Sequence, residues 1–469
     1  MLSSRDDNCL SAQSNLCLHE NNVLLNIFRE SQTIRETSTV VGVTRPRRFS
    51  IKATCLITHL LSFHFTSFRS RVFLGVFLLF FTVFCHDPDP EMHETTPQII
   101  MRWGYPAMIY DVTTDDGYIL ELHRIPYGKT NVTWPGGKRP VVFMQHGLEC
   151  ASDNWIVNLP NQSAGFLFAD AGFDVWLGNF RGNTYSKKHK NLKPSHSAFW
   201  EWSWDEMAKY DLPAMINKAL EVSGQDHLYY MGHSQGTLTM FSRLSNDTDG
   251  FGDKIRQFHA LAPVGAVKHI KGLLKFFADY FAPEFDGWFD VFGSGEFTPN
   301  NWIMKLAADS ICAGLKVESD LCDNILFLIA GPESNQLNQT RVPIYVSHTP
   351  AGTSTQNIVH WLQMVRHGGT PMYDYGTKGN KKHYGQSNVP AYDFTNIKRP
   401  MYLYWGDSDW LADPTDIQEF LLPHLNPSYI VANNKLADYN HLDFIWGLRA
   451  PDDIYKPIID LVRKDVLNN

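Results

Sequence analysis

The feature that most constrains the fold of this chain is a series of short, continuous apolar runs separated by longer stretches with helical patterning. An apolar run without alternation is typical of a strand that is buried on both faces, as in a parallel sheet covered by helices. The pattern therefore predicts an α/β fold with a mostly parallel central sheet. The runs are RPVVFMQHG (139–147), AGFDVWLGN (171–179), DHLYYMGHS (226–234), QFHALAPV (257–264), RPMYLYWGD (399–407) and SYIVAN (428–433).

Other segments near the start of this region also have clear secondary-structure signals. Met108–Val112 and Tyr118–Ile125 are rich in β-forming residues and flank an Asp-Asp-Gly sequence that is typical of a hairpin turn. Residues 199–224 have a helical pattern that ends at Gly224, a residue type that commonly terminates helices.

The alternation of strands and helices stops between about residues 265 and 398, where the sequence becomes rich in Phe, Leu, Trp, Gly and Tyr. We interpret residues 265–398 as a largely helical cap (lid) inserted into the core. Residues 86–264 and 399–469 are then the two parts of the core.

The N-terminal region differs from the rest of the chain. Residues 1–68 begin with a long polar stretch that has no helical or strand period, and we predict a disordered extension. Arg69 and Arg71 then precede an apolar run, Val72–Cys85, which is shorter than the roughly 20 residues that span a bilayer. Its length and its flanking residues favour a secretory signal peptide over 69–85, and a signal anchor that stays in the membrane is the alternative.

The sequence Gly232-His233-Ser234-Gln235-Gly236 follows one of the apolar runs and precedes a candidate helix. Glycine at both ends permits the close backbone approach that a tight strand-to-helix bend requires. In that setting the serine takes strained backbone angles and presents its hydroxyl at the top of the sheet. An isolated motif of this kind is also compatible with a surface turn, but the strand and helix on either side favour a nucleophile at Ser234.

A serine nucleophile requires a histidine base and a carboxylate that orients it, and in this arrangement the acid and then the histidine follow the serine. Only His424 and His441 follow the late run MYLYW. His424 precedes the last strand and therefore lies at the wrong edge of the sheet, whereas His441 follows that strand. The acid is expected in the loop after MYLYW, where Asp407 and Asp409 are both candidates.

Two other aspartates in that loop have a structural explanation. Asp413 precedes Pro414 at the start of a helical pattern and is therefore expected to be an N-cap, with Asp416 in the first turn.

An oxyanion intermediate needs two backbone N–H donors. Gln235, which follows the nucleophile, and Leu148, in the loop after VVFMQ, are the candidates.

The composition and the motifs exclude several other classes of function. The net charge of −8 is mild and spread along the chain, so nucleic acid is not an expected partner. The sequence has no glycine-rich phosphate loop, so no nucleotide is expected, and no cofactor is implied. No Cys/His group has the spacing of a zinc site, so no metal is expected.

Cysteines and sequons point to an oxidising secretory route. Cys312 and Cys322 flank a short loop, and in a secreted chain a disulfide is the natural interpretation, with two unpaired thiols as the alternative. Sequons for N-glycosylation, which are weak signals one by one, lie at Asn131, Asn161, Asn246 and Asn338.

From about residue 93 to 465 the chain resembles the acid lipases, the group that includes gastric lipase and lysosomal acid lipase. The matching segments include MQHGLECASDNWIVNLPNQS, ADAGFDVWLGNFRGNTYS, YYMGHSQGT, SHTPAGTSTQNIVHW, LADP and YNHLDFIWG. The resemblance implies an α/β-hydrolase core with a cap over an apolar cleft. It also implies a nucleophile at Ser234, an acid at Asp409, a base at His441, oxyanion amides at Leu148 and Gln235, and a disulfide between Cys312 and Cys322.

The chain departs from the usual acid lipase pattern in its long N-terminal extension, in HGLEC and in WGDSD, but no catalytic group is lost. The expected function is that of a serine lipase that hydrolyses ester bonds of neutral lipids, triacylglycerols or cholesteryl esters, at a lipid–water interface. A carboxylesterase or thioesterase for smaller substrates and a non-catalytic lipid-binding protein are the alternatives. The resemblance implies a secreted or lysosomal protein, and anchoring in the membrane by residues 69–85 is the alternative.

Overall fold

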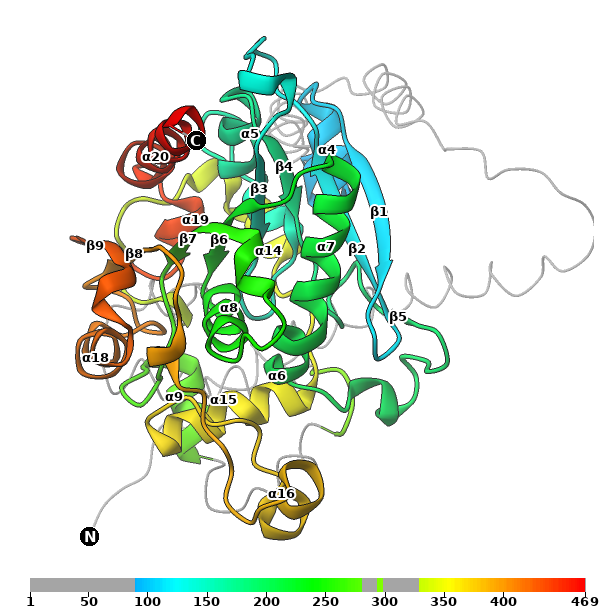
Figure 1. Cartoon of the computed structure of the whole chain (residues 1–469), viewed down its shortest axis with the longest axis vertical. Helices are drawn as coiled ribbons and strands as arrows, with labels where there is room; N and C mark the ends of the chain where they lie inside the picture. Colours follow the sequence, from blue (N-terminus) through cyan, green and yellow to red (C-terminus); the bar gives the residue numbers. More distant parts are fainter. Residues whose placement is uncertain (1–88, 281–292, 298–328, 469) are drawn as a thin grey trace, which may run out of the picture. The chain divides into compact units, whose positions relative to one another are not determined.

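The computed structural model describes residues 89–280, 293–297 and 329–468 (Figure 1). The extension predicted over 1–68, the apolar segment 69–85 and the predicted Cys312–Cys322 pair lie outside the described residues. In the described parts of the chain, no helix is long and apolar enough to cross a bilayer.

One sheet organises the described residues, with the strand order β1-β2-β4-β3-β6-β7-β8-β9 and with β5 paired to β2. The pairs along the path from β4 to β9 are all parallel, whereas β2 is antiparallel to both β1 and β4. The predicted α/β class with a mostly parallel sheet is therefore confirmed, as is the N-terminal hairpin. The strands are β1 Met108–Thr113, β2 Tyr118–Ile125, β3 Val141–Gln145, β4 Asp174–Leu177, β5 Lys188–His189, β6 Leu228–His233, β7 Ile255–Leu261, β8 Met401–Gly406 and β9 Ile430–Leu436.

The central strands are buried on both faces, which explains why their sequences do not alternate. Every residue of β3, β4, β6 and β8 is buried, whereas β9, at the end of the strand order, alternates between exposed and half-buried positions. Aromatic rings fill the space between neighbouring strands: the centroid of Tyr230 lies 6.1 Å from that of Phe143 and 5.5 Å from that of Phe258. Removal of this apolar surface from water is the main favourable contribution to folding.

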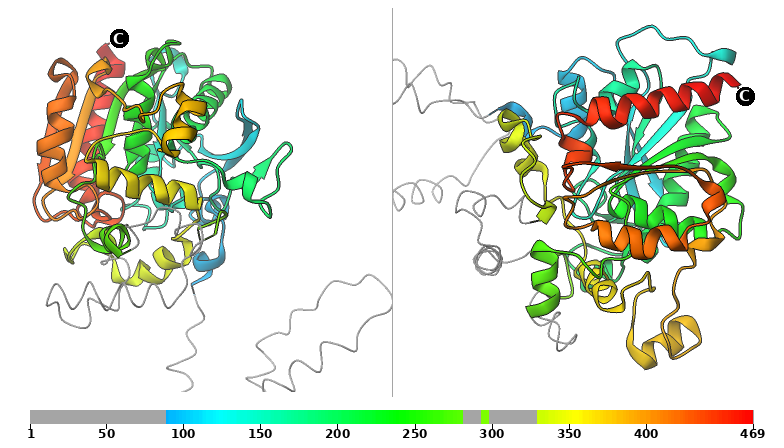
Figure 2. Two further views of the ribbon diagram at one scale, coloured as in Figure 1. Left: turned by 90° about the horizontal axis from the view of Figure 1, so that it is seen from below. Right: turned by 90° about the vertical axis from the view of Figure 1, so that its left-hand side faces the viewer.

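Helices cover both faces of the sheet (Figure 2). In the right-hand view, the red C-terminal helix α20 lies on one side of the strands and the orange helical segment that ends with α18 lies on the other. Against individual strands, α7 packs on β3, α8 on β6 and α5 on β4. These helices and the remaining ones outside the inserted segment are α4 Thr96–Arg102, α5 Ala164–Asp170, α6 Trp204–Glu206, α7 Leu212–Ser223, α8 Gln235–Ser245, α17 Pro414–Asp416, α18 Leu422–His424, α19 Asp443–Trp446 and α20 Lys456–Asn468.

The helix predicted over residues 199–224 starts later than its sequence pattern indicates. Ser197–Trp200 forms a 3-10 turn, and α6 begins only after Ser203, which forms a reciprocal capping box with Glu206. The S-x-x-E spacing of a capping box is the signal that marks this start. The end of α7 at Gly224, in the left-handed conformation, is as predicted.

Between β7 and β8 the described residues contain α9 (Gly272–Tyr280), α14 (Val342–His348), α15 (Thr355–His367) and α16 (Gly376–Tyr384). Helices α9 and α15 pack against each other (Figure 1). The helical content of these parts agrees with the insertion predicted over 265–398, whose limits as a cap stay a prediction.

Candidate active site

Ser234 lies on a sharp bend between β6 and α8. Its φ of 53° and ψ of −119° are strained backbone angles for a residue with a side chain. A Cβ at Gly232 would lie 2.8 Å from the carbonyl oxygen of Gly236, and a Cβ at Gly236 would lie 2.5 Å from that of Gln145. Both glycines are therefore needed for the close backbone approach at this bend.

His441 and Asp409 form a buried pair. Nδ1 of His441 lies 3.0 Å from Oδ1 and 2.9 Å from Oδ2 of Asp409, and the two side chains are 3% and 0% exposed. Oδ1 of Asp409 also accepts hydrogen bonds from the N–H groups of Leu411 and Ala412, both at 2.8 Å. Because Nδ1 faces a carboxylate, it carries the imidazole proton, and Nε2 of His441 is left free to accept one.

Asp407, the other candidate acid, points away from this pair. Its Oδ1 accepts a hydrogen bond from the N–H of Asp438 at 2.9 Å. The loops after β8 and β9 are tied together, since the N–H of Ser408 donates to the carbonyl of Tyr439 at 3.2 Å. A Cβ at Gly406 would lie 2.1 Å from that same carbonyl oxygen. This close approach brings the Asp409 side chain to the histidine.

His233 connects the bend at Ser234 to the loop that carries His441. Its Nε2 lies 2.9 Å from the carbonyl oxygen of His441, and the centroids of the two rings are 4.8 Å apart. Burial, together with the neighbouring His441, holds the pKa of His233 well below its usual range, so the neutral ring donates this bond. In the described part of the chain no hydrogen bond joins the Ser234 hydroxyl to the His441 imidazole. Catalytic hydrogen bonds are often long until a substrate is bound.

The two candidate oxyanion residues flank Ser234. Gln235 opens α8, where the N–H groups of the first turn have no acceptor inside the helix. Leu148 follows Gly147, and a Cβ placed on Gly147 would lie 3.0 Å from Cβ and 3.5 Å from Oγ of Ser234. His146 holds this loop, because its Nδ1 donates to the Gly147 carbonyl at 2.8 Å and its Nε2 accepts the N–H of Phe180 at 3.1 Å.

These residues share one edge of the sheet. Leu148 follows β3, Ser234 and Gln235 follow β6, Asp409 follows β8 and His441 follows β9. Since these strands are parallel, the residues meet where the strands end, which is where open α/β sheets bind ligands. The arrangement contains a hydroxyl, an oriented imidazole and backbone donors, which is the chemical equipment for nucleophilic acyl transfer.

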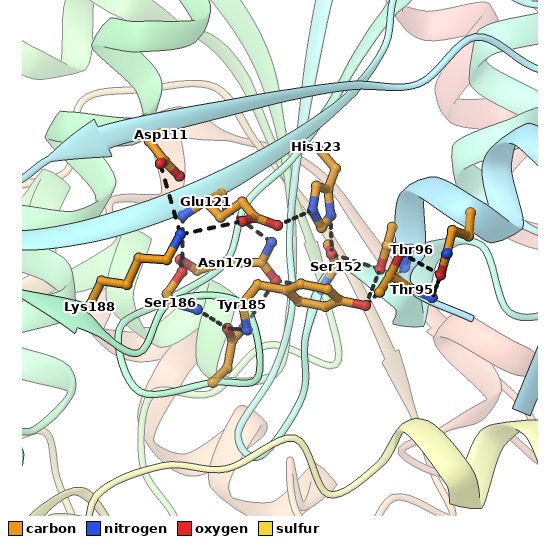
Figure 3. Close-up of polar contacts among 12 residues, drawn as sticks. Thr95, Thr96, Asp111, Glu121, His123, Ser152, Asn179, Tyr185, Ser186 and Lys188 are labelled. Carbon is orange, nitrogen blue, oxygen red and sulfur yellow. Dashed lines mark hydrogen bonds and ion pairs between the residues drawn. The ribbon is translucent and has the colours of Figure 1, made fainter. Parts of the chain in front are cut away.

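A second serine, histidine and carboxylate have the connectivity of a catalytic triad but lie in the core (Figure 3). Oγ of Ser152 lies 2.7 Å from Nδ1 of His123, and Nε2 of His123 lies 2.8 Å from Oε1 of Glu121. Ser152 and His123 are both 0% exposed, and the serine hydroxyl also contacts Oγ1 of Thr96 at 3.1 Å. No substrate reaches Ser152, so this set is a structural network that joins α4, β2 and the loop after β3.

Other predicted sites are partly described. The sequon residues Asn131, Asn161 and Asn246 are exposed, whereas Asn338 is half-buried and donates from Nδ2 to Oε1 of Gln162 at 3.1 Å. The predicted N-cap role of Asp413 is confirmed, since its side chain accepts the N–H of Thr415 at 2.8 Å. Among the residues that the structure describes, no cluster of His, Cys, Asp and Glu has the arrangement of a metal site.

Comparison with known proteins gives consistent matches. Residues 140–448 match the α/β-hydrolase fold family, and residues 96–159 match the partial α/β-hydrolase lipase region. The lipase lipl-1 of Caenorhabditis elegans is 81% identical over 399 residues, which cover 85% of this chain and 98% of the relative.

Two human lipases are more distant relatives. Gastric triacylglycerol lipase is 44% identical over 381 residues, which cover 81% of this chain and 94% of the relative. Lysosomal acid lipase/cholesteryl ester hydrolase is 43% identical over 380 residues, which cover 80% and 92%. On these matches, and on the fold described above, the chain belongs to the acid lipase family of α/β-hydrolases.

Proposed function

We propose that the chain is a serine lipase that hydrolyses ester bonds of neutral lipids, triacylglycerols or cholesteryl esters, through an acyl-enzyme on Ser234. The observation that carries this proposal is the buried Asp409–His441 pair beside the strained bend at Ser234. Relatives named as triacylglycerol lipase and as cholesteryl ester hydrolase support the substrate class.

The proposed reaction begins when Oγ of Ser234 attacks the ester carbonyl carbon while Nε2 of His441 takes the hydroxyl proton. The oxyanion of the tetrahedral intermediate accepts hydrogen bonds from the N–H groups of Leu148 and Gln235, and the loss of one such donor costs roughly 100- to 1000-fold in rate. His441 then gives its proton to the departing alcohol. Water attacks the acyl-enzyme with His441 again as base, the fatty acid leaves, and Ser234 regains its proton. Asp409 holds the imidazole in the required tautomer throughout.

An apolar cluster beside the candidate oxyanion loop supports a substrate with a long acyl chain. The cluster combines Leu273 of α9 and Ile358 and Leu362 of α15 with Phe297, and Leu148 packs against it. Burial of each methylene group contributes about 0.8 kcal/mol, so an acyl chain that packs against this cluster would bind more tightly the longer it is.

We infer further that the chain enters the secretory pathway and is secreted or lysosomal. The apolar segment 69–85, the exposed sequon residues and the family's gastric and lysosomal members support this inference. Anchoring in the membrane by residues 69–85 is the alternative. N-terminal sequencing of the protein from medium and from membranes separates cleavage after Cys85 from retention of the segment.

The test of the catalytic proposal compares the wild-type chain with Ser234→Ala. A fluorophosphonate probe is expected to label only the wild type, which hydrolyses triolein or cholesteryl oleate emulsions that the variant leaves intact. Hydrolysis confined to p-nitrophenyl butyrate points to a carboxylesterase for small substrates. A folded wild-type protein that takes no label and cleaves no ester contradicts the proposal and favours a lipid-binding role.

A further inference from the structure

The side chain of Gln235 is held by the inserted segment. Its Oε1 accepts hydrogen bonds from Nδ2 of Asn357 at 2.9 Å and from Nε1 of Trp361 at 2.8 Å. An indole N–H can only donate a hydrogen bond, so the Gln235 atom that faces Trp361 must be the carboxamide oxygen. This contact fixes which way the carboxamide is turned. Gln235, Asn357 and Trp361 are between 0% and 2% exposed, so these bonds are shielded from bulk water.

The two donors lie on one face of an anchored helix. Asn357 and Trp361 are one turn apart on α15, which brings their side chains to the same side. Ser354 is the N-cap of this helix: its Oγ accepts the N–H of Asn357 at 2.9 Å and donates to the carbonyl of Trp202 at 2.6 Å. The start of α15 is therefore tied to the segment that precedes α6, outside the inserted helices.

We propose that Asn357 and Trp361 are positioning residues for the oxyanion donor at Gln235. The inference rests on the proposed function, because it takes the Gln235 N–H as a donor to the intermediate. Strained backbone angles, such as those of Ser234, persist only where the surrounding structure holds them. A backbone N–H stabilises an oxyanion best when it already points at the position that the oxyanion will occupy. The other polar contact of the Gln235 side chain, from Nε2 to Sδ of Met207 at 3.4 Å, involves a weak acceptor. The two bonds from α15 therefore fix the residue that follows the nucleophile.

The test removes each donor separately. Trp361→Phe keeps a ring but loses the N–H, and Asn357→Ala removes the other donor without a change to the tryptophan. Trp134→Phe is a matched control, because the Trp134 indole is 8% exposed and donates to the carbonyl of Gly172 at 2.8 Å, a bond that involves neither Gln235 nor the anchor of α15. For each variant, kcat and KM with p-nitrophenyl butyrate, the inhibition constant of butylboronic acid and the melting temperature are measured.

Loss of either donor is expected to lower kcat about fivefold, the equivalent of one hydrogen bond. The inhibition constant of the boronic acid, which forms a tetrahedral adduct on serine, is expected to rise by a similar factor while KM stays constant. Trp134→Phe is expected to lower the melting temperature but to change neither kcat nor the inhibition constant. In a Gln235→Met background, Trp361→Phe is expected to have no further effect on kcat.

Wild-type kcat in Trp361→Phe and Asn357→Ala would overturn the inference, as would an undiminished loss of kcat in the Gln235→Met background. If Trp361→Phe does not fold, Asn357→Ala alone decides. Ser234→Ala distinguishes a failure of the proposed function from a failure of the role proposed for α15. Retained hydrolysis in Ser234→Ala contradicts the proposed function, whereas its loss, combined with wild-type kcat in the two donor variants, contradicts only the role of α15.

Discussion

The path of the loop after β8 decides which of two aspartates, Asp407 or Asp409, contacts the imidazole of His441. Both aspartates follow β8 by a few residues, and only Asp409 reaches the imidazole of His441. The Asp409 carboxylate is fully buried and accepts the N–H groups of Leu411 and Ala412 as well, so its orientation is determined before any substrate arrives.

Asp409→Asn is therefore expected to lower kcat by about 1000- to 10,000-fold, because an amide favours the wrong imidazole tautomer. Asp407→Asn is the matched control and is expected to keep a near wild-type kcat, since its side chain contacts the Asp438 N–H and, at 4.0 Å, Nζ of Lys435, and not the His441 imidazole. The measurement is kcat with p-nitrophenyl butyrate for both variants. Equal losses in the two variants contradict the assignment.

The same residues show what the sequence predicts and what it does not. The motif Gly232–Gly236 between a strand and a helix predicts Ser234. Strand order predicts His441, because parallel strands place the loops that follow them at one edge. Residue patterns alone do not distinguish Asp407 from Asp409. The path of their loop depends on the bond from the Ser408 N–H to the Tyr439 carbonyl, and these two residues are far apart in sequence. The bonds from Asn357 and Trp361 to Gln235 have no periodic sequence signal, because they depend on how α15 packs.

At the scale of secondary-structure elements, the network around Ser152 joins α4, β2 and the loops after β3 and β4, which lie far apart in the sequence. Besides its bonds to His123 and Thr96, Ser152 donates its N–H to Oδ1 of Asn179 at 2.9 Å, and Nδ2 of Asn179 donates to the carbonyl of Glu121 at 2.9 Å. The loop after β3, which carries Leu148, is thus tied to β2 and to the loop after β4 (Figure 3).

Ser152→Ala is expected to lower the free energy of unfolding by about 1–3 kcal/mol, because it leaves Nδ1 of the buried His123 without its partner and removes one of the partners of the Thr96 hydroxyl, which keeps Tyr185. Fluorophosphonate labelling is expected to persist in this variant, whereas Ser234→Ala is expected to lose the label and to keep its stability. Urea unfolding and probe labelling of both variants check the prediction. Loss of the label in a folded Ser152→Ala protein contradicts the structural role.

At the scale of the whole molecule, buried carboxyl groups couple stability to pH. Burial raises the pKa of Glu149 to about 8 and that of Asp443 to about 6. Burial also raises the pKa values of Asp205 and Glu206, whose carboxyl groups are neighbours. Such groups keep their protons in the folded chain at pH values where the unfolded chain has lost them. Their stabilisation is complete below the ordinary carboxyl pKa of about 4 and is lost as the pH rises through the folded values.

Buried histidines act in the opposite direction. Burial lowers the pKa of His146 to about 4 and those of His259 and His360 to about 3. The stability that these neutral rings contribute is present above the ordinary histidine pKa of about 6.5 and is lost as the pH falls through the folded values. Stability is therefore expected to be highest at intermediate, mildly acidic pH and to fall on both sides.

Glu206→Gln tests the contribution of the buried carboxyl groups to this balance. Oε2 of Glu206 accepts the N–H of Ser203 at 2.7 Å, and a glutamine oxygen in the same place retains that capping bond. The substitution removes one ionisation and also the repulsion between the two carboxylates. A carboxyl that keeps its proton only in the folded chain makes stability fall with pH between the ordinary carboxyl pKa and the raised folded value, so stability is expected to decline less steeply in the variant between about pH 4.5 and 7. Above about pH 8, where these carboxyls are ionised in both states, the slopes of the two proteins are expected to differ little. Urea unfolding at half-unit pH steps measures both curves, and parallel curves between about pH 4.5 and 7 contradict the role of this carboxyl pair.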